Sequence, residues 1–314
     1  GSTYTGEFKK GLMSGTGTLI YKDDNNGRLK YIGEFKDDLE HGQGTMHYAN
    51  GETYTGIFKE GNELNRKSTV VKLTTDEKYY ALIIGNNEYQ HHEKLDAAVR
   101  DADEISKILE NKYGFEITKL INGNYNEIVD AIIKFTKDRN YNDNLLIYYA
   151  GHGELIQKES RGYWLPIDAG EEQDSKWLGN DSIKNWIRSS KAKHILLIVD
   201  SCFSGSLMRG SGENKSVEKL TATSIKRLQV KKTRLVITSG GNEEVADGIG
   251  DSKNSVFAEP LIKALKENNS VIRSIELFQT VQNYVINNAN QTPEHSLIHG
   301  TGHNGGEFLF FPKS

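Results

Sequence analysis

The sequence predicts two parts of different construction: an all-β repeat array at the N-terminus, and an α/β domain in which helices cover both faces of a mostly parallel six-stranded sheet. Three observations support this prediction. A Tyr-x-Gly-x-Phe pattern occurs three times in residues 1–66, where 12 of the 31 glycines fall. All four prolines lie beyond residue 165. From Lys78 onward, short apolar runs alternate with longer amphipathic segments, which is typical of βαβ units.

The repeated pattern predicts successive β-hairpins near the N-terminus. Aromatic and polar residues alternate in each copy and glycines mark the turns, which favours strands over helices. A single hairpin would leave one apolar face exposed, so we expect the hairpins to stack into an elongated antiparallel solenoid. The three copies are Tyr4-Thr5-Gly6-Glu7-Phe8, Tyr31-Ile32-Gly33-Glu34-Phe35 and Tyr54-Thr55-Gly56-Ile57-Phe58.

This array resembles MORN repeats over about residues 3–62, with two complete repeats and a third that fades after Gly61. The resemblance implies a surface for a protein partner or for oligomerisation, with a regulatory, sensing or docking role. A passive scaffold is the alternative interpretation. Residues 1–66 carry more acidic than basic side chains, so electrostatic contact with a membrane is not expected. Residues 63–77 look like the linker to the next domain.

The apolar spacing of the α/β region predicts its strands and helices. We expect strands at residues 79–84, 116–121, 145–149, 194–199, 234–238 and 308–311; the third to fifth are near-continuous apolar runs, which implies burial on both faces. Apolar residues three to four apart predict helices at residues 95–111, 126–138, 182–189, 258–267 and 274–288. Residues 205–232 are rich in Gly, Ser, Lys and Thr, and we expect a long exposed loop there.

Two strand ends carry the most reactive side chains. His152 follows the 145–149 strand, and Cys202, the single cysteine, follows the 194–199 strand. Because reactive groups in an open α/β sheet gather beyond the carboxyl ends of the strands, we expect these side chains on neighbouring loops. A thiolate attacks carbonyl carbon, and a nearby imidazole generates the thiolate and protonates the leaving amine. We predict a Cys–His dyad, with the backbone N–H groups of Gly153 and Cys202 as its oxyanion hole.

Both side chains also have a purely structural interpretation. Most free cysteines are small buried hydrophobes, and a lone histidine is more often tied to a backbone carbonyl than catalytic. The polar, glycine-containing surroundings of Cys202 argue against burial. The agreement between two independent loops favours catalysis by His152 and Cys202 over this structural alternative.

The second part of the chain resembles the caspase and metacaspase superfamily over about residues 78–312. The resemblance implies amide-bond hydrolysis through an acyl-enzyme, with His152 as general base and acid and Cys202 as nucleophile. Asp-Ser-Cys stands where the caspase signature has Gln-Ala-Cys, which is closer to metacaspases and bacterial caspase-like proteins. The segments that carry the resemblance are Ala81-Leu82-Ile83-Ile84-Gly85, Tyr148-Tyr149-Ala150-Gly151-His152-Gly153 and Val199-Asp200-Ser201-Cys202.

The same resemblance divides the peptidase-like domain, residues 78–314. Residues 78–204 would correspond to a large subunit, 205–233 to an exposed loop between the subunits, and 234–314 to a small subunit. Basic side chains in this loop lie where family members separate their subunits, and Arg209 and Arg227 are the candidate sites of self-cleavage. The alternative is a solvated basic loop without a purpose, since some relatives work uncleaved.

Specificity is predicted for Arg or Lys before the scissile bond. By resemblance to metacaspases, Asp200, two positions before Cys202, and Asp101 are acids of that substrate pocket. A buried pair of carboxylates favours Arg or Lys through charge-assisted hydrogen bonds. The alternatives are a solvated helix residue for Asp101 and a turn cap for Asp200. An Asp-specific protease would need arginines instead, and Arg100, the nearest one, lies out of register on the predicted helix.

No cofactor is expected, although calcium is a question that the resemblance raises because many metacaspases require it. Asp168, Asp174 and Asp181 supply hard oxygen ligands in roughly the right region. The full acidic set is not found, since Arg209 stands where a further acid would be expected. Calcium dependence is therefore not predicted.

Three histidines near the C-terminus have a spacing that raises the question of a zinc site. His295, His299 and His303 are spaced by four and would share one face of a helix. A proline and two glycines in the same segment argue against a helix there. The sequence therefore predicts no metal site.

Composition excludes several functional classes. The formal net charge of −4 provides no positive field that would attract nucleic acid or an anionic membrane, so neither partner is expected. The longest apolar runs are far shorter than the roughly 20 residues of a membrane-spanning helix. A single cysteine excludes an internal disulfide and suits a reducing compartment, so we expect a cytoplasmic protein.

Together these features predict a cysteine endopeptidase that cleaves protein substrates, is regulated through its repeats and acts in cell death or defence. Two alternatives stay open. One is a catalytically inactive caspase-fold interaction protein in which the repeats supply the function, and the other is a protease specific for Asp. The presence of both His152 and Cys202 favours the enzyme over the inactive protein.

Overall fold

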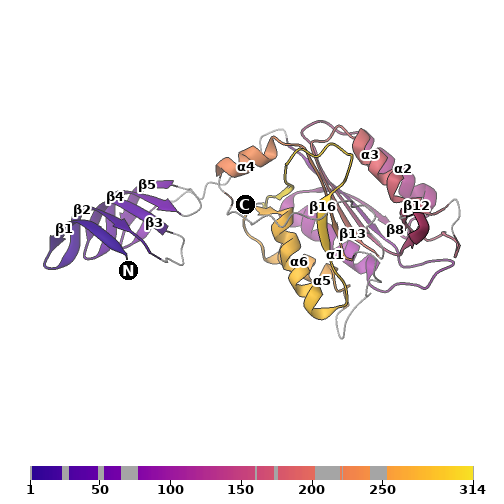
Figure 1. Cartoon of the computed structure of the whole chain (residues 1–314), viewed down its shortest axis with the longest axis horizontal. Coiled ribbons are helices and arrows are strands. Elements are labelled where there is room, and N and C mark those ends of the chain that lie inside the picture. The colour runs from indigo at the N-terminus through magenta and orange to yellow at the C-terminus, as the bar shows by residue number, and fades with distance from the viewer. Residues whose placement is uncertain are drawn as a thin grey trace. The chain divides into compact units, whose positions relative to one another are not determined.

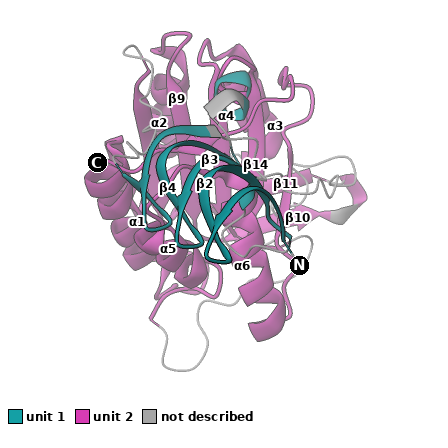
Figure 2. Ribbon diagram, turned by 90° about the vertical axis from the view of Figure 1, so that its left-hand side faces the viewer, with its two compact units in different colours: residues 1–72, 218–227 teal, residues 73–217, 228–314 magenta. Residues whose placement is uncertain are grey.

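The chain forms two compact units, residues 1–72 with 218–227 and residues 73–217 with 228–314 (Figure 2). Each unit has its own sheet and its own hydrophobic core. The boundary near residue 72 falls within the segment interpreted as a linker. The computed structural model describes residues 2–22, 28–48, 53–64, 77–159, 161–172, 176–201, 220, 222–240 and 253–313.

The first unit contains a six-stranded antiparallel sheet in which every strand pairs with the next one along the chain (Figure 1). This order confirms the predicted array of β-hairpins. The strands are β1 (Thr3–Lys9), β2 (Leu12–Ile20), β3 (Arg28–Lys36), β4 (Leu39–Tyr48), β5 (Thr53–Lys59) and β6 (Asn62–Leu64).

Facing glycines explain the repeated pattern. Gly33 of β3 pairs with Gly44 of β4, and a Cβ on Gly44 would lie 2.1 Å from the Tyr31 hydroxyl oxygen. Only glycine therefore leaves room for the tyrosine ring to lie across the neighbouring strand. The Tyr31 ring contacts Phe35 of its own repeat at 5.0 Å between centroids and Phe58 of the next repeat at 4.7 Å. These aromatic contacts join successive repeats into one core.

The second unit is built on a six-stranded sheet with the order β16-β14-β13-β9-β7-β8. Its first five strands in chain order are parallel, and β16 runs antiparallel to β14 at one edge. All seven residues of both β9 and β13 are buried, as their apolar runs predicted. The strands are β7 (Tyr79–Gly85), β8 (Glu116–Ile121), β9 (Asn144–Ala150), β13 (His194–Asp200), β14 (Thr233–Thr238) and β16 (Glu294–Leu297).

The sixth strand of this sheet differs from the expectation. The 308–311 run was expected to join it, but β17 (Leu309–Phe310) pairs instead with β15 (Ile272–Arg273) in a separate two-stranded sheet. Phe310 is fully buried because it packs on the rings of Tyr113 and Phe115. The apolar run therefore marked burial correctly, whereas no residue of the edge strand β16 is fully buried and no apolar run reveals it.

Five of the predicted helices are present, with ends that differ by three residues or fewer. Among the described helices, α2 packs on α3, whereas α1 packs on α5 and α5 on α6, so the two groups cover the two faces of the sheet (Figure 1). These helices are α1 (Ala98–Tyr113), α2 (Tyr125–Lys137), α3 (Asn180–Ser189), α5 (Ala258–Glu267) and α6 (Ser274–Asn288). None of the described helices is long and apolar enough to cross a membrane.

A sixth helix, α4 (Ala222–Gln229), lies where the sequence was expected to form an exposed loop. Ile225 is only 4% exposed, and Leu228, three residues later, is half-buried. One apolar stripe of this length is enough to hold a short helix, and the surrounding Lys, Thr and Ser residues concealed it. Residues 205–219 and 221 of the same predicted loop lie outside the described residues.

Between β9 and α3 the chain forms a small three-stranded sheet beside the main one. It comprises β10 (Gly153–Ile156), β11 (Arg161–Trp164) and β12 (Leu178–Gly179), and the 3₁₀ turn η1 (Gln157–Glu159) joins the first two strands. Because β10 begins immediately after the loop that ends β9, this sheet extends from the carboxyl edge of the main sheet.

Candidate active site

The candidate active site lies at the carboxyl edge of the main sheet, where β9 and β13 end side by side. Ala150 at the end of β9 pairs with Asp200 at the end of β13. Beyond this last pair, the Gly151 N–H donates a hydrogen bond to the Asp200 carbonyl oxygen at 3.3 Å. His152 and the segment Asp200-Ser201 therefore leave the sheet as neighbours. Cys202 itself lies outside the residues that the structure describes.

One nitrogen of the His152 imidazole is fixed by the backbone. Its Nε2 lies 2.8 Å from the Glu93 carbonyl oxygen. A carbonyl oxygen only accepts hydrogen bonds, so we assign the proton of the neutral ring to Nε2 and the lone pair to Nδ1. This tautomer can take a proton at Nδ1, and the Glu93 carbonyl then stabilises the resulting imidazolium. The carbonyl therefore orients the ring, as a carboxylate does from the other ring nitrogen in a three-residue triad.

Two tyrosine hydroxyls hold the backbone of His152. The His152 N–H donates to Tyr89 Oη at 2.7 Å, and Tyr149 Oη donates to the His152 carbonyl oxygen at 2.7 Å. The Tyr89 ring also packs on the imidazole, with 4.5 Å between the ring centroids. Glycine is needed at position 151 because a Cβ on Gly151 would lie 2.5 Å from Tyr89 Oη. Contacts on both sides therefore restrict the orientation of His152.

Gly153, a predicted oxyanion-hole residue, is the first residue of β10 and is buried. It pairs with Trp164 of β11, whose ring stacks on Tyr149 with 4.2 Å between the centroids. The Leu165 N–H donates to the His152 carbonyl oxygen at 3.0 Å. The small sheet therefore fixes the course of the chain directly after the imidazole. The second predicted donor of the oxyanion hole, the N–H of Cys202, lies beyond the described residues.

Asp101 and Asp200, which come from distant parts of the sequence, meet at one serine. The Ser255 N–H donates to Asp101 Oδ2 at 3.1 Å, and the Ser255 hydroxyl donates to Asp200 Oδ2 at 2.5 Å. Asn254 Nδ2 donates to the other Asp101 oxygen at 2.6 Å. Asp101 is 0% exposed and Asp200 is 5% exposed. They form a buried pair, and neither a solvated helix residue nor a local turn cap describes them.

Burial controls the ionisation of this carboxylate pair. Desolvation raises the pKa of Asp101 to about 6, although hydrogen bonds from Ser255 and Asn254 act in the opposite direction. Burial likewise raises the pKa of the Tyr148 hydroxyl well above its usual value, and the charges of Asp200 and Asp101 raise it further. The site therefore has an excess of negative potential, which a cationic side chain would relieve.

The arginines considered from the sequence lie in different places. Arg100 is on α1 next to Asp101, but its Nη2 donates to the Asp96 carbonyl oxygen at 3.4 Å, within its own segment. Arg227 is exposed. It lies within α4, so the peptide bond that follows it is part of a helix. Arg209 lies outside the described part of the chain.

Four groups of the site were not identified from the sequence: Tyr89, the Glu93 carbonyl, Asn254 and Ser255. Tyr89 and Glu93 follow the carboxyl end of β7, so the rule that reactive groups gather at strand ends could have drawn attention to them. Asn254 and Ser255 precede α5, more than 150 residues from Asp101. No pattern in the sequence connects them with the two acids.

The histidines weighed as zinc ligands do not share a helix. His295 lies in β16 and its Nε2 is 3.2 Å from Ser274 Oγ, whereas His299 and His303 lie in the turns that follow. The Nδ1 of His303 accepts the Arg234 N–H at 3.2 Å. In the described part of the chain, no group of three or more His, Cys, Asp or Glu side chains is placed to hold a metal ion.

The acids considered for calcium have other partners in the structure. Asp168 Oδ1 accepts the Tyr125 N–H at 2.8 Å, and its Oδ2 lies 3.1 Å from Lys176 Nζ. Asp181 Oδ1 lies 3.5 Å from Lys184 Nζ on α3. Asp174 falls among residues that the structure does not describe. Asp168 and Asp181 thus stabilise loops and helices through their own protein partners.

Comparisons with known proteins identify both units. The family model described as the caspase domain matches residues 78–301, and the model described as the MORN repeat matches residues 4–25 and 31–53. Among solved structures, protein GSU0716 of Geobacter sulfurreducens superimposes with a TM-score of 0.51 at 20% identity, covering 69% of this chain and 92% of that one. At this identity the likeness shows the fold alone.

Two curated relatives match a shorter segment. The mucosa-associated lymphoid tissue lymphoma translocation protein 1 homolog of Mus musculus is 30% identical over 109 residues, which are 35% of this chain and 12% of the relative. The Homo sapiens protein of that name is 29% identical over 109 residues, or 35% of this chain and 13% of the relative. The match thus spans about an eighth of the length of these relatives.

We predict that Asp101→Asn changes how stability depends on pH. The pKa of Asp101 is 3.8 in the unfolded chain and about 6 in the folded protein, so the protonated carboxyl favours the folded state. Its contribution to the free energy of unfolding is fully present below pH 4 and is lost as pH rises through 6. The lost contribution is about 3 kcal/mol. Urea unfolding between pH 4 and 7 should therefore show a smaller loss of stability on raising pH in Asp101→Asn than in the wild type. The exposed Asp130→Asn should keep the wild-type slope, and equal slopes in all three proteins would contradict the burial of Asp101.

Proposed function

The chain belongs to the caspase-domain family, and on that basis we propose that it is a cysteine endopeptidase that cleaves protein substrates after Arg or Lys. The observation that carries the proposal is the buried pair of carboxylates formed by Asp101 of α1 and Asp200, which ends the strand that leads into Cys202 and pairs with β9, the strand before His152. Family membership supports the reaction class, and the carboxylate pair supports the specificity.

In the proposed mechanism, His152 Nδ1 takes the proton of the Cys202 thiol, and the thiolate attacks the carbonyl carbon of the scissile bond. The N–H groups of Gly153 and Cys202 stabilise the oxyanion of the tetrahedral intermediate. The imidazolium gives its proton to the leaving amine as the C–N bond breaks, which leaves a thioester. His152 then takes a proton from water, whose oxygen attacks the thioester, and the proton returns to the departing Cys202 sulfur.

The carboxylate pair supports Arg or Lys as the residue that precedes the cut. Each carboxylate oxygen accepts more than one hydrogen bond, so the contacts of Ser255 with Asp101 and Asp200 do not exhaust them. A guanidinium or ammonium brought close to the pair would lower the pKa of Asp101 and keep it ionised. An aspartate side chain in the same place would add a third negative charge to a buried site.

Self-cleavage in the loop between the subunits is part of the proposal. A protease binds an extended chain, so cleavage after Arg227 requires α4 to unwind. Arg209 lies outside the described residues, and both arginines stay candidates for self-cleavage.

We assign the MORN repeats to docking a protein partner. Phe8 is 62% exposed, Ile32 43% and Ile57 41%, so the sheet offers apolar side chains to a partner. Docking would place the peptidase domain near its substrates, and a reducing compartment such as the cytoplasm would keep the Cys202 thiol available. A role in cell death or defence would follow from such regulated proteolysis.

The proposed activity predicts a clear order of substrates. Among matched fluorogenic peptides ending in Arg, Lys or Asp, we expect cleavage after Arg and Lys at least roughly 100-fold faster than after Asp, with or without a calcium chelator, because only a cation neutralises the acid pair. Cys202→Ala and His152→Ala should each lower kcat by a factor of roughly 1,000 or more while the melting temperature is retained. Asp200→Ala should raise KM for the Arg peptide about tenfold.

The exposed Asp130→Ala provides a matched control and should behave as the wild type in this panel. Preferred cleavage after Asp, or an unchanged KM in Asp200→Ala, would place the specificity elsewhere. Normal turnover in Cys202→Ala or His152→Ala would contradict the dyad.

Tyr89 is expected to act by positioning His152. Tyr89→Phe keeps the ring that packs on the imidazole but removes the acceptor of the His152 N–H, a bond worth on the order of 1 kcal/mol. We expect kcat for the Arg peptide to fall about tenfold with KM unchanged, because binding and the acid pair are not touched. Tyr80→Phe, a half-buried tyrosine at the opposite end of β7, is the control. A change in KM alone, or equal losses in both variants, would show that the hydroxyl has no role in positioning.

A further inference from the structure

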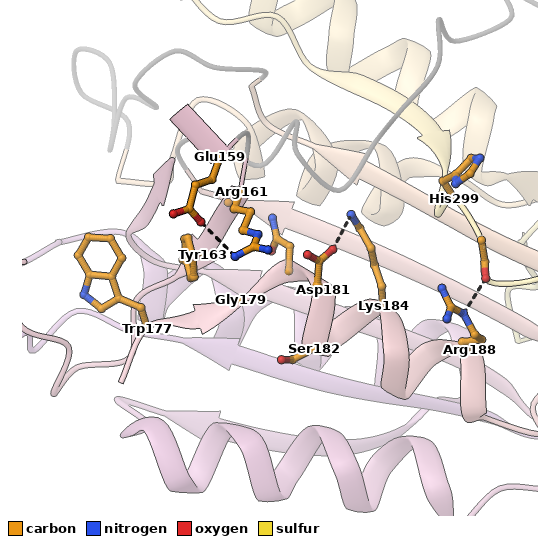
Figure 3. A pocket seen from close by; sticks show the side chains of 13 residues that line it. Glu159, Arg161, Tyr163, Trp177, Gly179, Asp181, Ser182, Lys184, Arg188 and His299 are labelled. Atoms are coloured by element: carbon orange, nitrogen blue, oxygen red, sulfur yellow. Dashed lines mark hydrogen bonds and ion pairs between the residues drawn. The ribbon is translucent and has the colours of Figure 1, made fainter. Parts of the chain in front are cut away.

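A cleft of about 740 Å³ lies outside the candidate active site, along the outer side of α3 (Figure 3). Strands β11 and β12 form one end, with Tyr163 and Trp177, and the turn after β16 forms the other, with His299 and Gly300. Arg188, near the end of α3, closes this second end by donating from Nε to the Gly300 carbonyl oxygen at 2.7 Å. A cavity of this size holds a ligand of several hundred daltons.

Arg188 lines the second end of the cleft, and two further cations, Lys232 and Lys231, lie beside the glycine-rich turn that continues from Gly300. A Cβ on Gly300 would lie 3.2 Å from Arg188 Nη2. A Cβ on Gly302 would lie 3.6 Å from Lys232 Nζ, and a Cβ on Gly305 would lie 3.7 Å from Lys231 Nζ. All three glycines are exposed and have positive φ, so any other residue would be strained there and would fill the space beside the cation.

The charge of these three cations is not balanced by nearby carboxylates. Within the described part of the chain, none of Arg188, Lys231 and Lys232 forms an ion pair, whereas the other two cations of the cleft do. Arg161 lies 3.0 Å from Glu159 and Lys184 lies 3.5 Å from Asp181, as Figure 3 shows. The acids in the middle of the cleft are thus already neutralised, and the positive charge is concentrated at the glycine-rich end.

A fourth cation lies behind this end. Arg234 is fully buried, and its guanidinium donates to four backbone carbonyls, including those of Ala192 at 2.7 Å and Lys193 at 3.0 Å. Burial lowers the pKa of Lys232, and the charge of Arg234 lowers it further. Cations that repel one another create a positive potential, and a multivalent anion bound between them is stabilised because it relieves the repulsion.

The two ends of the cleft differ in character and are well separated. The planes of the Tyr163 and Trp177 rings make an angle of 63°, with 5.7 Å between their centroids, and both side chains are partly exposed. Arg188 lies eight positions after Asn180 on α3, which is a rise of about 12 Å along the helix. A ligand with a flat ring at one end and clustered negative charge at the other matches this spacing.

We propose that this cleft binds a nucleoside polyphosphate, with its base against Tyr163 and Trp177 and its phosphoryl groups running from Arg188 at the end of the cleft to Lys232 and Lys231 along the adjoining glycine-rich turn. A chain of phosphoryl groups carries several negative charges in a row, which suits cations placed one after another along a turn. The cationic end lies at the amino edge of the parallel strands, where β14 begins, and so opposite the candidate active site. The proposal does not depend on peptidase activity.

Isothermal titration calorimetry on full-length Cys202→Ala tests the proposal, with inorganic triphosphate, ATP and adenosine as probes. We expect ATP to bind at least fivefold tighter than triphosphate and adenosine to bind weakest, with binding that weakens as salt rises. Arg188→Gln and Lys232→Gln should each weaken ATP and triphosphate at least tenfold. Threonine is favourable in strands, so Tyr163→Thr should keep β11 intact. This variant should bind ATP no more tightly than triphosphate, with its affinity for triphosphate unchanged.

Lys263→Gln, an exposed cation on α5, is the matched control and should leave every affinity unchanged. The proposal is overturned if ATP at millimolar concentration gives no binding heat, or if Arg188→Gln and Lys232→Gln bind as the control does. It is also overturned if a hexaglutamate peptide competes as well as ATP, since the cleft would then recognise acidic peptides. Circular dichroism of each variant confirms that a lost affinity is not a lost fold.

Discussion

The parallel pairing of β9 with β13 is the constraint on which the site depends. Seven residue pairs, from His194 with Asn144 to Asp200 with Ala150, end the two strands at the same level of the sheet. A shift of one residue would move every side chain of a strand to the opposite face, and because both strands are buried along their full length, each side chain would then meet packing that fits a different one. Close packing on both faces thus favours this register, in which the loop of His152 leaves the sheet beside the segment that leads into Cys202.

At the same edge the fold keeps two carboxylates out of water, which is unfavourable unless they are satisfied. Ser255 compensates part of this desolvation, because its N–H donates a hydrogen bond to Asp101 and its hydroxyl donates one to Asp200. The raised pKa of Asp101 shows that hydrogen bonds offset the desolvation only in part. A cationic substrate side chain supplies the remaining compensation, so the same electrostatic imbalance that weakens the free protein favours the binding of Arg or Lys.

Features that are local or periodic could be predicted from the sequence, whereas features that depend on contacts between distant residues could not. The glycine and tyrosine positions of the repeats, the buried runs of β9 and β13, and the neighbouring positions of the two loops all follow from periodicity and from the strand-end rule. The edge strand β16 was missed because none of its four residues is fully buried, and α4 because its apolar stripe is short. Ser255 could not be found, since only the folded chain brings it to Asp101 and Asp200.

Affinity labelling of the thiol tests the central claim, a reactive Cys202 beside a cation-selective pocket. Peptide chloromethyl ketones that differ only in a terminal Arg or Asp would be reacted with the wild type, His152→Ala and Asp200→Asn, and the adduct followed by intact mass and peptide mapping. The account predicts an adduct on Cys202 that forms far faster with the Arg reagent, and that slows in both variants. Equal rates for the two reagents, or an unchanged rate in His152→Ala, would contradict it.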